Sequence, residues 1–341
     1  MPGLSRSESV TIPVIDFTDF GDGTSEKAEE IGREFFKACR DVGFAYLVNT
    51  GIPKDKVDEM FEWSSKFFSL PVEVKNKAPH PPEGWKHRGY SGIGMEQLSQ
   101  MVFDLEELAA IRTGKFPDFK ESFDLGKDDT SATLDNIWIP EEDLPGFRKH
   151  VMDYFWTCRR FQVEKLLPAL AIGMGLDRNF FNEYHKNADN QLRLLRYPSG
   201  PAQAFETGQK GRCGAHTDYI TCTILFQDRV GGLEVESPNE PGVFIPVHPM
   251  EGAAIFNIGD FLMRWSNDTL KSTLHRVRAP PRNQGHTDII PERFSIPYFM
   301  AADKTTVIDC LPGCWGPDKP KKYEPVSAQE YINMRLNATY V

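Results

Sequence analysis

Short apolar segments separated by turns follow one another through the second half of the chain. Several short strands at such spacing are typical of a β-sandwich or jelly roll, in which alternate side chains of each strand face an interior. We therefore predict a β-rich core there. The segments are 192–197, 221–226, 232–235, 243–247, 253–258, 275–277 and 293–300.

The rest of the chain is predicted to be mainly helical. Ser25 stands where a helix cap is expected, before apolar residues at helical spacing. A second serine, Ser327, begins Ser-Ala-Gln-Glu, which has the spacing of a capping box. Helices are expected from Ser25 to Cys39 and at 54–68, 177–186 and 327–339, and the segment 141–173 is expected to be mostly helical. Strands are expected at 12–17 and 43–49.

These patterns predict an α+β fold whose core is a double-stranded β-helix, or jelly roll, flanked by helices. Residues 1–10 are polar and are expected to be disordered. We expect an N-terminal region of helices and strands at 11–185, the jelly-roll core at 186–305, and a C-terminal helix packing on that core within 306–341.

Charge and composition narrow the class of protein. The net charge of −10 argues against nucleic acid and against an anionic membrane surface, since phosphate contacts need Lys and Arg. The first ten residues have no apolar segment typical of a signal peptide, and no apolar run is long enough to span a bilayer. We expect a cytoplasmic monomer or weak homodimer that acts on a small molecule, with its six cysteines as free thiols.

Three residues have the spacing of metal ligands: His216 and Asp218, on either side of Thr217, and His275 further along the chain. On a strand, residues two apart point to the same side, so His216 and Asp218 could share one metal. Two imidazoles and a carboxylate are the facial triad of non-heme Fe(II) oxygenases. Catalytic zinc accepts the same ligands, so the triad alone leaves a zinc hydrolase open.

Two other histidines compete for these roles. A second His-x-Asp begins at His286, but it lies in a polar loop and no histidine follows it. His248 stands between prolines and is more simply a surface residue at a strand end. The first His-x-Asp leads directly into an apolar, β-branched segment, which supplies the rigid support that metal ligands need.

A possible carboxylate receptor lies in the last of the apolar segments. Alternation along 293–299 puts Arg293, Ser295, Pro297 and Phe299 on one face. A guanidinium with a hydroxyl two residues away can bind a carboxylate through charge-assisted hydrogen bonds. Such a receptor suits an iron oxygenase, which needs an organic acid as the source of two electrons.

Taken together, the sequence resembles the isopenicillin-N-synthase-like branch of the 2-oxoglutarate- and Fe(II)-dependent dioxygenases, and the resemblance covers nearly the whole chain. The segments that carry it are Ile-Pro-Val-Ile-Asp at 12–16, Gly-Phe-Ala-Tyr-Leu-Val-Asn-Thr-Gly-Ile-Pro at 43–53, Phe-Phe-Ser-Leu-Pro at 67–71, Gly-Gly-Leu-Glu-Val at 231–235, Asn-Ile-Gly-Asp at 257–260, His-Arg-Val at 275–277 and Arg-Phe-Ser at 293–295.

The resemblance implies that His216, Asp218 and His275 bind Fe(II). It implies that Arg293 and Ser295 hold 2-oxoglutarate, with O2 as the second co-substrate, and that Tyr197 adds a contact to the same carboxylate. Ascorbate is a possible support for activity. The asparagine usual beside that tyrosine is replaced by Arg196. Some family members use no 2-oxoglutarate, so an oxidase of the isopenicillin-N-synthase type stays open.

The substrate is expected to be a small aromatic or heterocyclic compound. Tyr219 adjoins a metal ligand and Phe299 shares the face of Arg293, so two rings could enclose a flat molecule. Arg193 and Tyr197 are four residues apart on the same predicted strand, so their side chains face the same side. Arg193 could therefore bind an acidic or carbonyl group of the substrate. The pattern resembles fungal small-molecule oxygenases, including thymine-hydroxylase-like and polyketide-tailoring enzymes, more than plant enzymes. The segment 101–108 and the C-terminal helix are possible lids.

Overall fold

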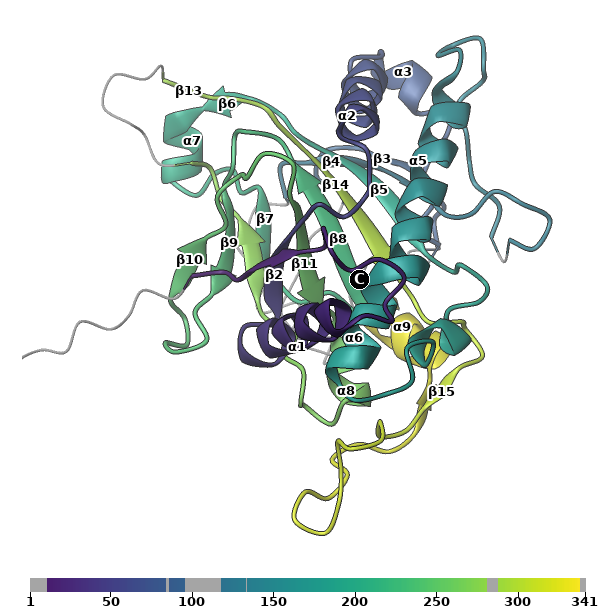
Figure 1. Cartoon of the computed structure of the whole chain (residues 1–341). Helices are drawn as coiled ribbons and strands as arrows, with labels where there is room; N and C mark the ends of the chain where they lie inside the picture. Colours follow the sequence, from purple (N-terminus) through teal and green to yellow (C-terminus); the bar gives the residue numbers. More distant parts are fainter. Residues whose placement is uncertain (1–10, 84–85, 96–117, 133, 281–287, 338–341) are drawn as a thin grey trace, which may run out of the picture.

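Two facing β-sheets form the centre of the molecule, and helices pack around them (Figure 1). The computed structural model describes residues 11–83, 86–95, 118–132, 134–280 and 288–337. The possible lid at 101–108 and His286 lie outside these segments. No helix within them is long and apolar enough to cross a membrane.

The larger sheet joins strands from both halves of the chain. Within the described residues its order is β1 (Val14–Asp16), β2 (Phe44–Val48), β11 (Ala254–Ile258), β8 (Cys222–Gln227), β14 (Arg293–Met300), β5 (Gln191–Tyr197), β4 (Glu121–Leu125) and β3 (Gly89–Ser91). Apart from the parallel pair β1–β2, these neighbours run antiparallel. Strands from the predicted regions 11–185 and 186–305 thus share one sheet, and the division between the regions stays a prediction.

The smaller sheet faces the larger one. Its order is β10 (Phe244–Pro246), β9 (Leu233–Glu236), β12 (His275–Val277) and β7 (Cys213–His216). Two further pairs of short strands lie outside it: β6 (Gly200–Pro201) with β13 (Ile289–Ile290), and β15 (Val307–Ile308) with β16 (Val326–Ser327). The predicted jelly-roll core is confirmed, and each of the predicted strands of the second half is present.

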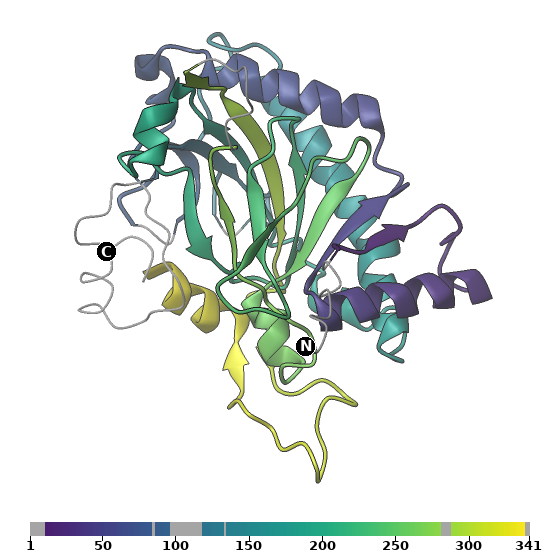
Figure 2. The ribbon, with the colours of Figure 1, turned by 90° about the vertical axis from the view of Figure 1, so that its left-hand side faces the viewer.

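Helices cover the outer face of the larger sheet and close one end of the molecule. The α-helices of the described residues are α1 (Glu26–Asp41), α2 (Lys54–Phe68), α3 (Val72–Lys75), α5 (Phe147–Phe161), α6 (Leu167–Gly173), α7 (Ala202–Glu206), α8 (Asp260–Trp265) and α9 (Ala328–Asn337), of which α7 lies beside β6 instead (Figure 1). In Figure 2, α8 and the yellow helix α9 lie together at one end of the sheets. Their contact includes the rings of Phe261 and Tyr331, whose centroids are 5.8 Å apart.

Both predicted helix caps are present. The Ser25 hydroxyl accepts a hydrogen bond from the Ala28 amide. Ser327 and Glu330 form the reciprocal bonds of a capping box, because each side chain accepts from the other residue's amide. The segment 141–173 is mostly helical, as predicted, because α5, a π-helical turn and α6 follow one another from Phe147 to Gly173. The helix predicted at 177–186 was too long, since the segment forms only a 3-10 turn at Phe181–Tyr184.

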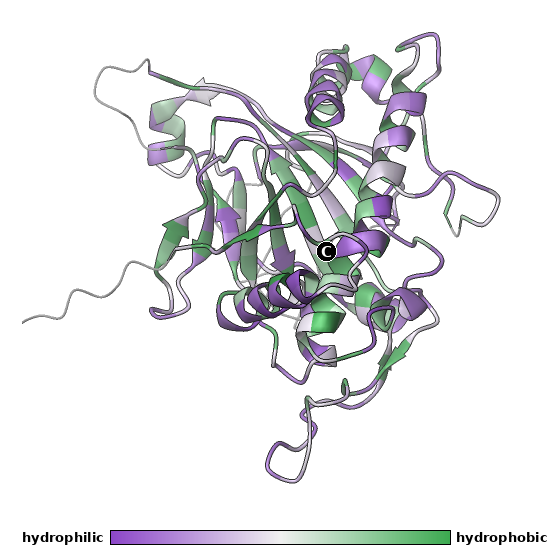
Figure 3. Cartoon of the chain, in the orientation of Figure 1, coloured by the Kyte–Doolittle hydropathy of each residue, from purple (hydrophilic) through white to green (hydrophobic). Residues whose placement is uncertain are grey.

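Alternation along β14 divides its side chains between two environments. Ile296, Tyr298 and Met300 belong to the apolar core under the helices, where the rings of Tyr298 and Phe155 of α5 lie 5.3 Å apart. Arg293 and the other residues of its parity line a cavity between the sheets. Figure 3 shows the same division in α1, whose outer face is mostly hydrophilic. The helices therefore cover one face of the larger sheet, and the other face lines the cavity between the sheets.

The ring of one histidine, His185, is buried and contacts a polar atom through each of its two nitrogens. His185 is fully buried, with Nδ1 beside the Phe181 carbonyl oxygen (2.7 Å) and Nε2 beside the Thr221 hydroxyl (3.1 Å). Burial lowers the pKa of His185 from its ordinary 6.5 to about 4. Between these values the unfolded chain binds the proton and the folded chain does not, so stability is full above about pH 6.5 and falls toward pH 4.

We expect the His185→Gln variant to lose part of this pH dependence. Its free energy of unfolding should fall less than that of the unchanged protein between pH 6.5 and 4, by roughly 2–4 kcal/mol, since one pKa unit corresponds to about 1.4 kcal/mol. Urea unfolding across this pH range measures the difference. Equal slopes for the two proteins would show that His185 already binds a proton when folded.

Candidate active site

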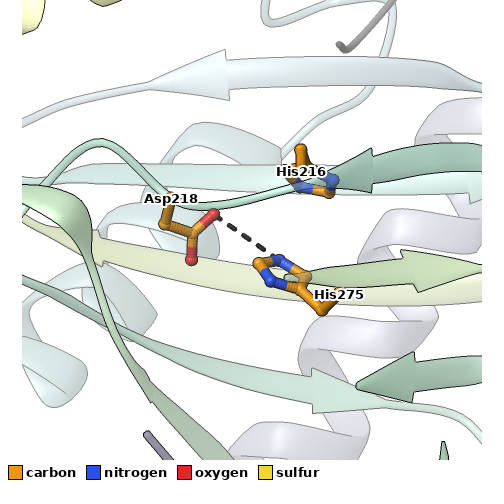
Figure 4. Close-up of side chains that lie close together, drawn as sticks. All are labelled: His216, Asp218 and His275. Atoms are coloured by element: carbon orange, nitrogen blue, oxygen red, sulfur yellow. Dashed lines mark ion pairs between the residues drawn. The ribbon is translucent and has the colours of Figure 1, made fainter. Parts of the chain in front are cut away.

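The three predicted metal ligands converge between the sheets (Figure 4). His216 ends β7 and His275 begins β12, and the antiparallel register places these two residues directly opposite each other. Asp218 comes from the loop that follows β7. One ligand atom from each residue lies within 4.8 Å of the others, and Asp218 Oδ1 is 3.8 Å from His275 Nε2.

The strand setting expected for Asp218 was wrong. Strand β7 ends at His216, and the Asp218 carbonyl oxygen instead accepts the Asp260 amide at 2.8 Å. Gly259 makes this approach possible, because a Cβ there would stand 2.0 Å from the Ile220 carbonyl oxygen. Thr217 still points the other way, toward the Asp260 carboxylate at 2.9 Å. The loop therefore aims His216 and Asp218 at one point without strand geometry.

Hydrogen bonds fix the orientation of the Asp218 carboxylate. Oδ2 accepts from the Thr223 hydroxyl at 2.5 Å and from Asn257 Nδ2 at 2.7 Å. The other carboxylate oxygen, Oδ1, faces His275. Burial raises the pKa of Asp218, but the two imidazoles and these hydrogen bonds lower it more, so the net pKa lies below the ordinary 3.8. The carboxylate is therefore ionised, as a metal ligand must be.

The two imidazoles also have the tautomer and the neutral charge state that metal ligands need. His216 Nδ1 lies 2.8 Å from the Gly214 carbonyl oxygen, and His275 Nδ1 lies 3.2 Å from that of Thr273. A backbone partner at Nδ1 selects the tautomer that leaves Nε2 free to coordinate. Burial lowers the pKa of both rings, that of His275 to about 4, so both are neutral. This donor set fits a divalent iron held on one face.

Arg293 and Ser295 form a buried cationic receptor. Arg293 is completely buried, and it donates to the Ser295 hydroxyl and to Gln227 Oε1, both at 3.1 Å. Within the described part of the chain, its Nε has no hydrogen-bond partner and no carboxylate lies within ion-pair distance. A buried guanidinium with neutral partners and an orphaned donor fits an anionic ligand, because an uncompensated buried charge is costly.

Tyr197 lies beside this receptor. It pairs with Arg293 across β5 and β14, and the Arg293 guanidinium carbon is 5.1 Å from the centre of its ring. Burial raises the pKa of Tyr197 to about 12, so its hydroxyl keeps its proton and can donate. Arg196 has the opposite strand parity and pairs with Glu121 and Glu292. Replacing the family's asparagine by Arg196 therefore adds no cation to the receptor.

A second guanidinium near the receptor was missed by the sequence analysis. Arg212 is 1% exposed and donates to the Pro291 carbonyl oxygen, and its Nε and Nη1 have no partner among the described residues. Its guanidinium carbon lies 5.9 Å from the Tyr197 ring centre. Burial and the charge of Arg293 lower the pKa of Arg212 to about 10. Two cations thus flank Tyr197 and favour an anion there.

The three predicted substrate residues all line the cavity that contains the triad, which has a volume of about 220 Å³. Tyr219 is half-buried, and the Arg335 guanidinium carbon of α9 lies 4.3 Å from the centre of its ring. Phe299 lies opposite Thr223 in the register of β14 and β8, close to Asp218. Arg193 forms an ion pair with Asp124, with Nε 2.6 Å from Oδ1.

Comparisons with known proteins agree with this site. Two family models match the chain: the N-terminal region of non-haem dioxygenases in morphine synthesis at 12–141, and the 2OG-Fe(II) oxygenase superfamily at 180–302. The 2-oxoglutarate-dependent dioxygenase frbA of Dothideomycetidae sp. is 38% identical, and the match covers 97% of this chain and 98% of that protein. The chain belongs to the 2-oxoglutarate- and Fe(II)-dependent dioxygenases.

Other similar proteins have names that refer to small molecules. The proline hydroxylase buaE of Petromyces alliaceus is 38% identical, with 96% of this chain and 98% of that protein covered. The crystal structure of thymine-7-hydroxylase from Neurospora crassa, in complex with alpha-KG and thymine, superimposes with a TM-score of 0.86 at 38% identity and covers 98% of both chains. The predicted family, fold class and enzyme class are confirmed, as are Fe(II) and 2-oxoglutarate as cofactor and co-substrate.

The dioxygenase should depend on the hydrogen bond from Asn257 to Asp218. We expect Asn257→Leu to weaken Fe(II) binding by roughly 10–100-fold, the usual effect of losing a partner that orients a metal ligand. Thr223→Val removes the other bond and should act in the same direction. Anaerobic equilibrium dialysis with Fe(II) measures both. Unchanged iron affinity in both variants would mean that the carboxylate needs neither partner.

Proposed function

We propose that this dioxygenase oxidises a C–H bond of a small aromatic or heterocyclic metabolite in fungal secondary metabolism. The observation that carries the proposal is the position of Tyr219 and Phe299, since both rings line the cavity that contains the triad. Rings in this arrangement can stack on a flat molecule. The product can be hydroxylated, or the reaction can end in desaturation or ring rearrangement.

In this proposal His216, Asp218 and His275 hold the iron, and Arg293, Ser295 and Tyr197 hold the distal carboxylate of 2-oxoglutarate. The bound iron, with 2-oxoglutarate and O2, supplies the oxidising power for a C–H bond. The chain's own residues position and shield the reactants. The Asp218 carboxylate stays fixed by Thr223 and Asn257, and the buried Arg293 offers its charge to the incoming anion.

The names of the relatives support a small-molecule substrate, and they differ in what they modify. One is a proline hydroxylase, and another binds thymine in its crystal structure. A pyrimidine methyl hydroxylase is therefore a second candidate function. The rings of Tyr219 and Phe299 would suit thymine as well as a larger aromatic metabolite, so a substrate screen has to include both.

The proposal is tested by succinate release from 2-oxoglutarate in the presence of Fe(II), O2 and a panel of methyl-bearing aromatic and heterocyclic compounds that includes thymine. We expect one of the flat compounds to increase succinate release above the background, with an oxidised product in matching amount. Tyr219→Ala and Phe299→Ala should each raise the KM for that compound and leave the KM for 2-oxoglutarate unchanged. Stimulation only by aliphatic compounds would contradict the aromatic assignment.

A further inference from the structure

The C-terminal helix α9 forms part of the wall of the cavity that contains the triad. Its residues Gln329, Ile332 and Asn333 line that cavity, and their spacing puts them on one face of the helix. Tyr331 and Arg335, four residues apart, lie on another face and are buried. The helix therefore has one face toward the cavity and another that docks it onto the rest of the molecule.

Arg335 contacts three residues in and beside the loop that carries Asp218. Its Nη1 forms an ion pair with Asp260 Oδ2 at 2.8 Å, and its Nη2 donates to the Thr217 hydroxyl at 3.3 Å. Its guanidinium carbon lies 4.3 Å from the centre of the Tyr219 ring. Thr217 and Tyr219 are the chain neighbours of Asp218, so one guanidinium contacts the residues on both sides of a predicted iron ligand.

Asp260 joins these contacts to Asp218 itself. The Asp260 carboxylate accepts from the Thr217 hydroxyl at 2.9 Å, and the Asp260 amide donates to the Asp218 carbonyl oxygen at 2.8 Å. Asp260 is completely buried at the start of α8, and the ion pair with Arg335 stabilises its charge there. The loop is therefore held by α8 and α9, which lie together at one end of the sheets (Figure 2).

The Arg335 guanidinium lies behind the Tyr219 ring as seen from the cavity. Of the described residues that line the cavity, Tyr219 is one and Arg335 is not. A guanidinium at this distance from an aromatic ring is attracted to it by a cation–π interaction, which fixes the orientation of the ring. Arg335 is therefore placed to act on a ligand in the cavity only through the loop.

We infer that Arg335 is a positioning residue for the iron site, which holds residues 217–219 so that Asp218 meets His216 and His275. The inference rests on the proposed function, because it takes Asp218 as an iron ligand. Strand β7 ends at His216, so the position of Asp218 depends on contacts from outside the sheet. Arg335 supplies such contacts from α9. Docking of the C-terminal helix and assembly of the iron site therefore depend on the same side chain.

Arg335→Lys tests the inference with the charge kept. A lysine can keep the ion pair with Asp260, but it has no planar group to stack on the Tyr219 ring. Anaerobic equilibrium dialysis of the full chain with 2-oxoglutarate measures the dissociation constant of Fe(II). We expect this constant to rise about threefold to tenfold, less than the roughly 10–100-fold for loss of a direct partner of a metal ligand. Unchanged or tighter binding of Fe(II) overturns the inference.

Arg335→Met removes the charge as well as the contacts. By charge alone, loss of a cation near the site would strengthen Fe(II) binding, because like charges repel. Weaker binding in this variant therefore indicates a displaced ligand. The melting temperature of Arg335→Met should fall, because the buried Asp260 loses its cation, while that of Arg335→Lys should stay near the value of the unchanged protein. A folded Arg335→Met protein that binds Fe(II) as tightly as the unchanged protein also overturns the inference.

The matched control is Arg264→Lys in α8. Arg264 also ties α8 to the C-terminal segment, since it donates to the Glu324 carbonyl oxygen at 2.7 Å and its guanidinium carbon lies 4.7 Å from the Tyr323 ring centre. None of its contacts with described residues involves 217–219. We expect its Fe(II) dissociation constant to equal that of the unchanged protein. A control that weakens Fe(II) binding as much as Arg335→Lys would overturn the specific role of Arg335.

The unchanged protein tests the proposed function separately. If it binds Fe(II) and forms succinate from 2-oxoglutarate in air, the dioxygenase site works, whatever the Arg335 variants do. Full Fe(II) affinity in those variants then removes the positioning role and keeps the proposed function. An unchanged protein that binds no Fe(II) removes both.

Discussion

Asp218→Ala is expected to abolish succinate formation from 2-oxoglutarate. The carboxylate is the one anionic ligand of the triad, and without it two neutral imidazoles are left to hold a dication. The loss should exceed the roughly 10–100-fold caused by removing an outer hydrogen-bond partner. Succinate formation in air, with Fe(II) supplied in excess, measures the effect.

The control for this variant is Asp318→Ala, which removes a carboxylate from an exposed position. It should keep full activity. Because the Asp218 side chain is buried and accepts two hydrogen bonds, circular dichroism should accompany the assay to show that the variant is folded. A folded Asp218→Ala protein with activity within tenfold of the unchanged enzyme would contradict the assignment of the triad.

Arg293→Leu is expected to raise the KM for 2-oxoglutarate by roughly 30- to 1,000-fold. This range corresponds to about 2–4 kcal/mol, the usual loss when one partner of a buried charge pair is removed. The thermal stability of the ligand-free protein should not fall, since the described residues offer Arg293 no carboxylate within ion-pair distance and the apolar replacement removes a buried charge.

The matched control is Arg196→Leu, because Arg196 lies opposite Phe294, one position along the β5–β14 pair from Arg293, and has the opposite parity. It loses ion pairs with Glu121 and Glu292 and should leave the KM for 2-oxoglutarate unchanged. Steady-state kinetics and a thermal melt of each variant distinguish the two roles. If Arg293→Leu melts at a much lower temperature and keeps its KM, then Arg293 is structural.

Local periodicity made much of the fold and the site predictable. The period of two along β14 correctly placed Arg293, Ser295, Pro297 and Phe299 on the cavity side, because burial of the other face under helices leaves only one register. The triad was predictable because two of its ligands lie two residues apart in sequence and the third opens a strand. The roles of all these residues still await the experiments above.

Contacts between distant segments could not be predicted in the same way. The Asp124–Arg193 pair joins β4 to β5, and sequence alone gives no sign that Arg193 is already matched. Arg88, Lys127 and Lys304 line the same cavity from three separate segments, which are brought together because β14, β5, β4 and β3 follow one another in the sheet. The setting of Asp218 was missed for a similar reason, since Asp260 and Gly259 shape its loop from far along the chain.

The central claim is that this chain binds one Fe(II) through His216, Asp218 and His275 and one 2-oxoglutarate through Arg293. Anaerobic titration of the full chain with Fe(II) in the presence of 2-oxoglutarate tests it most directly. We predict a visible charge-transfer absorption that saturates at one Fe(II) per chain and is absent from Asp218→Ala. No absorption, or an unchanged absorption in Asp218→Ala, would contradict the account.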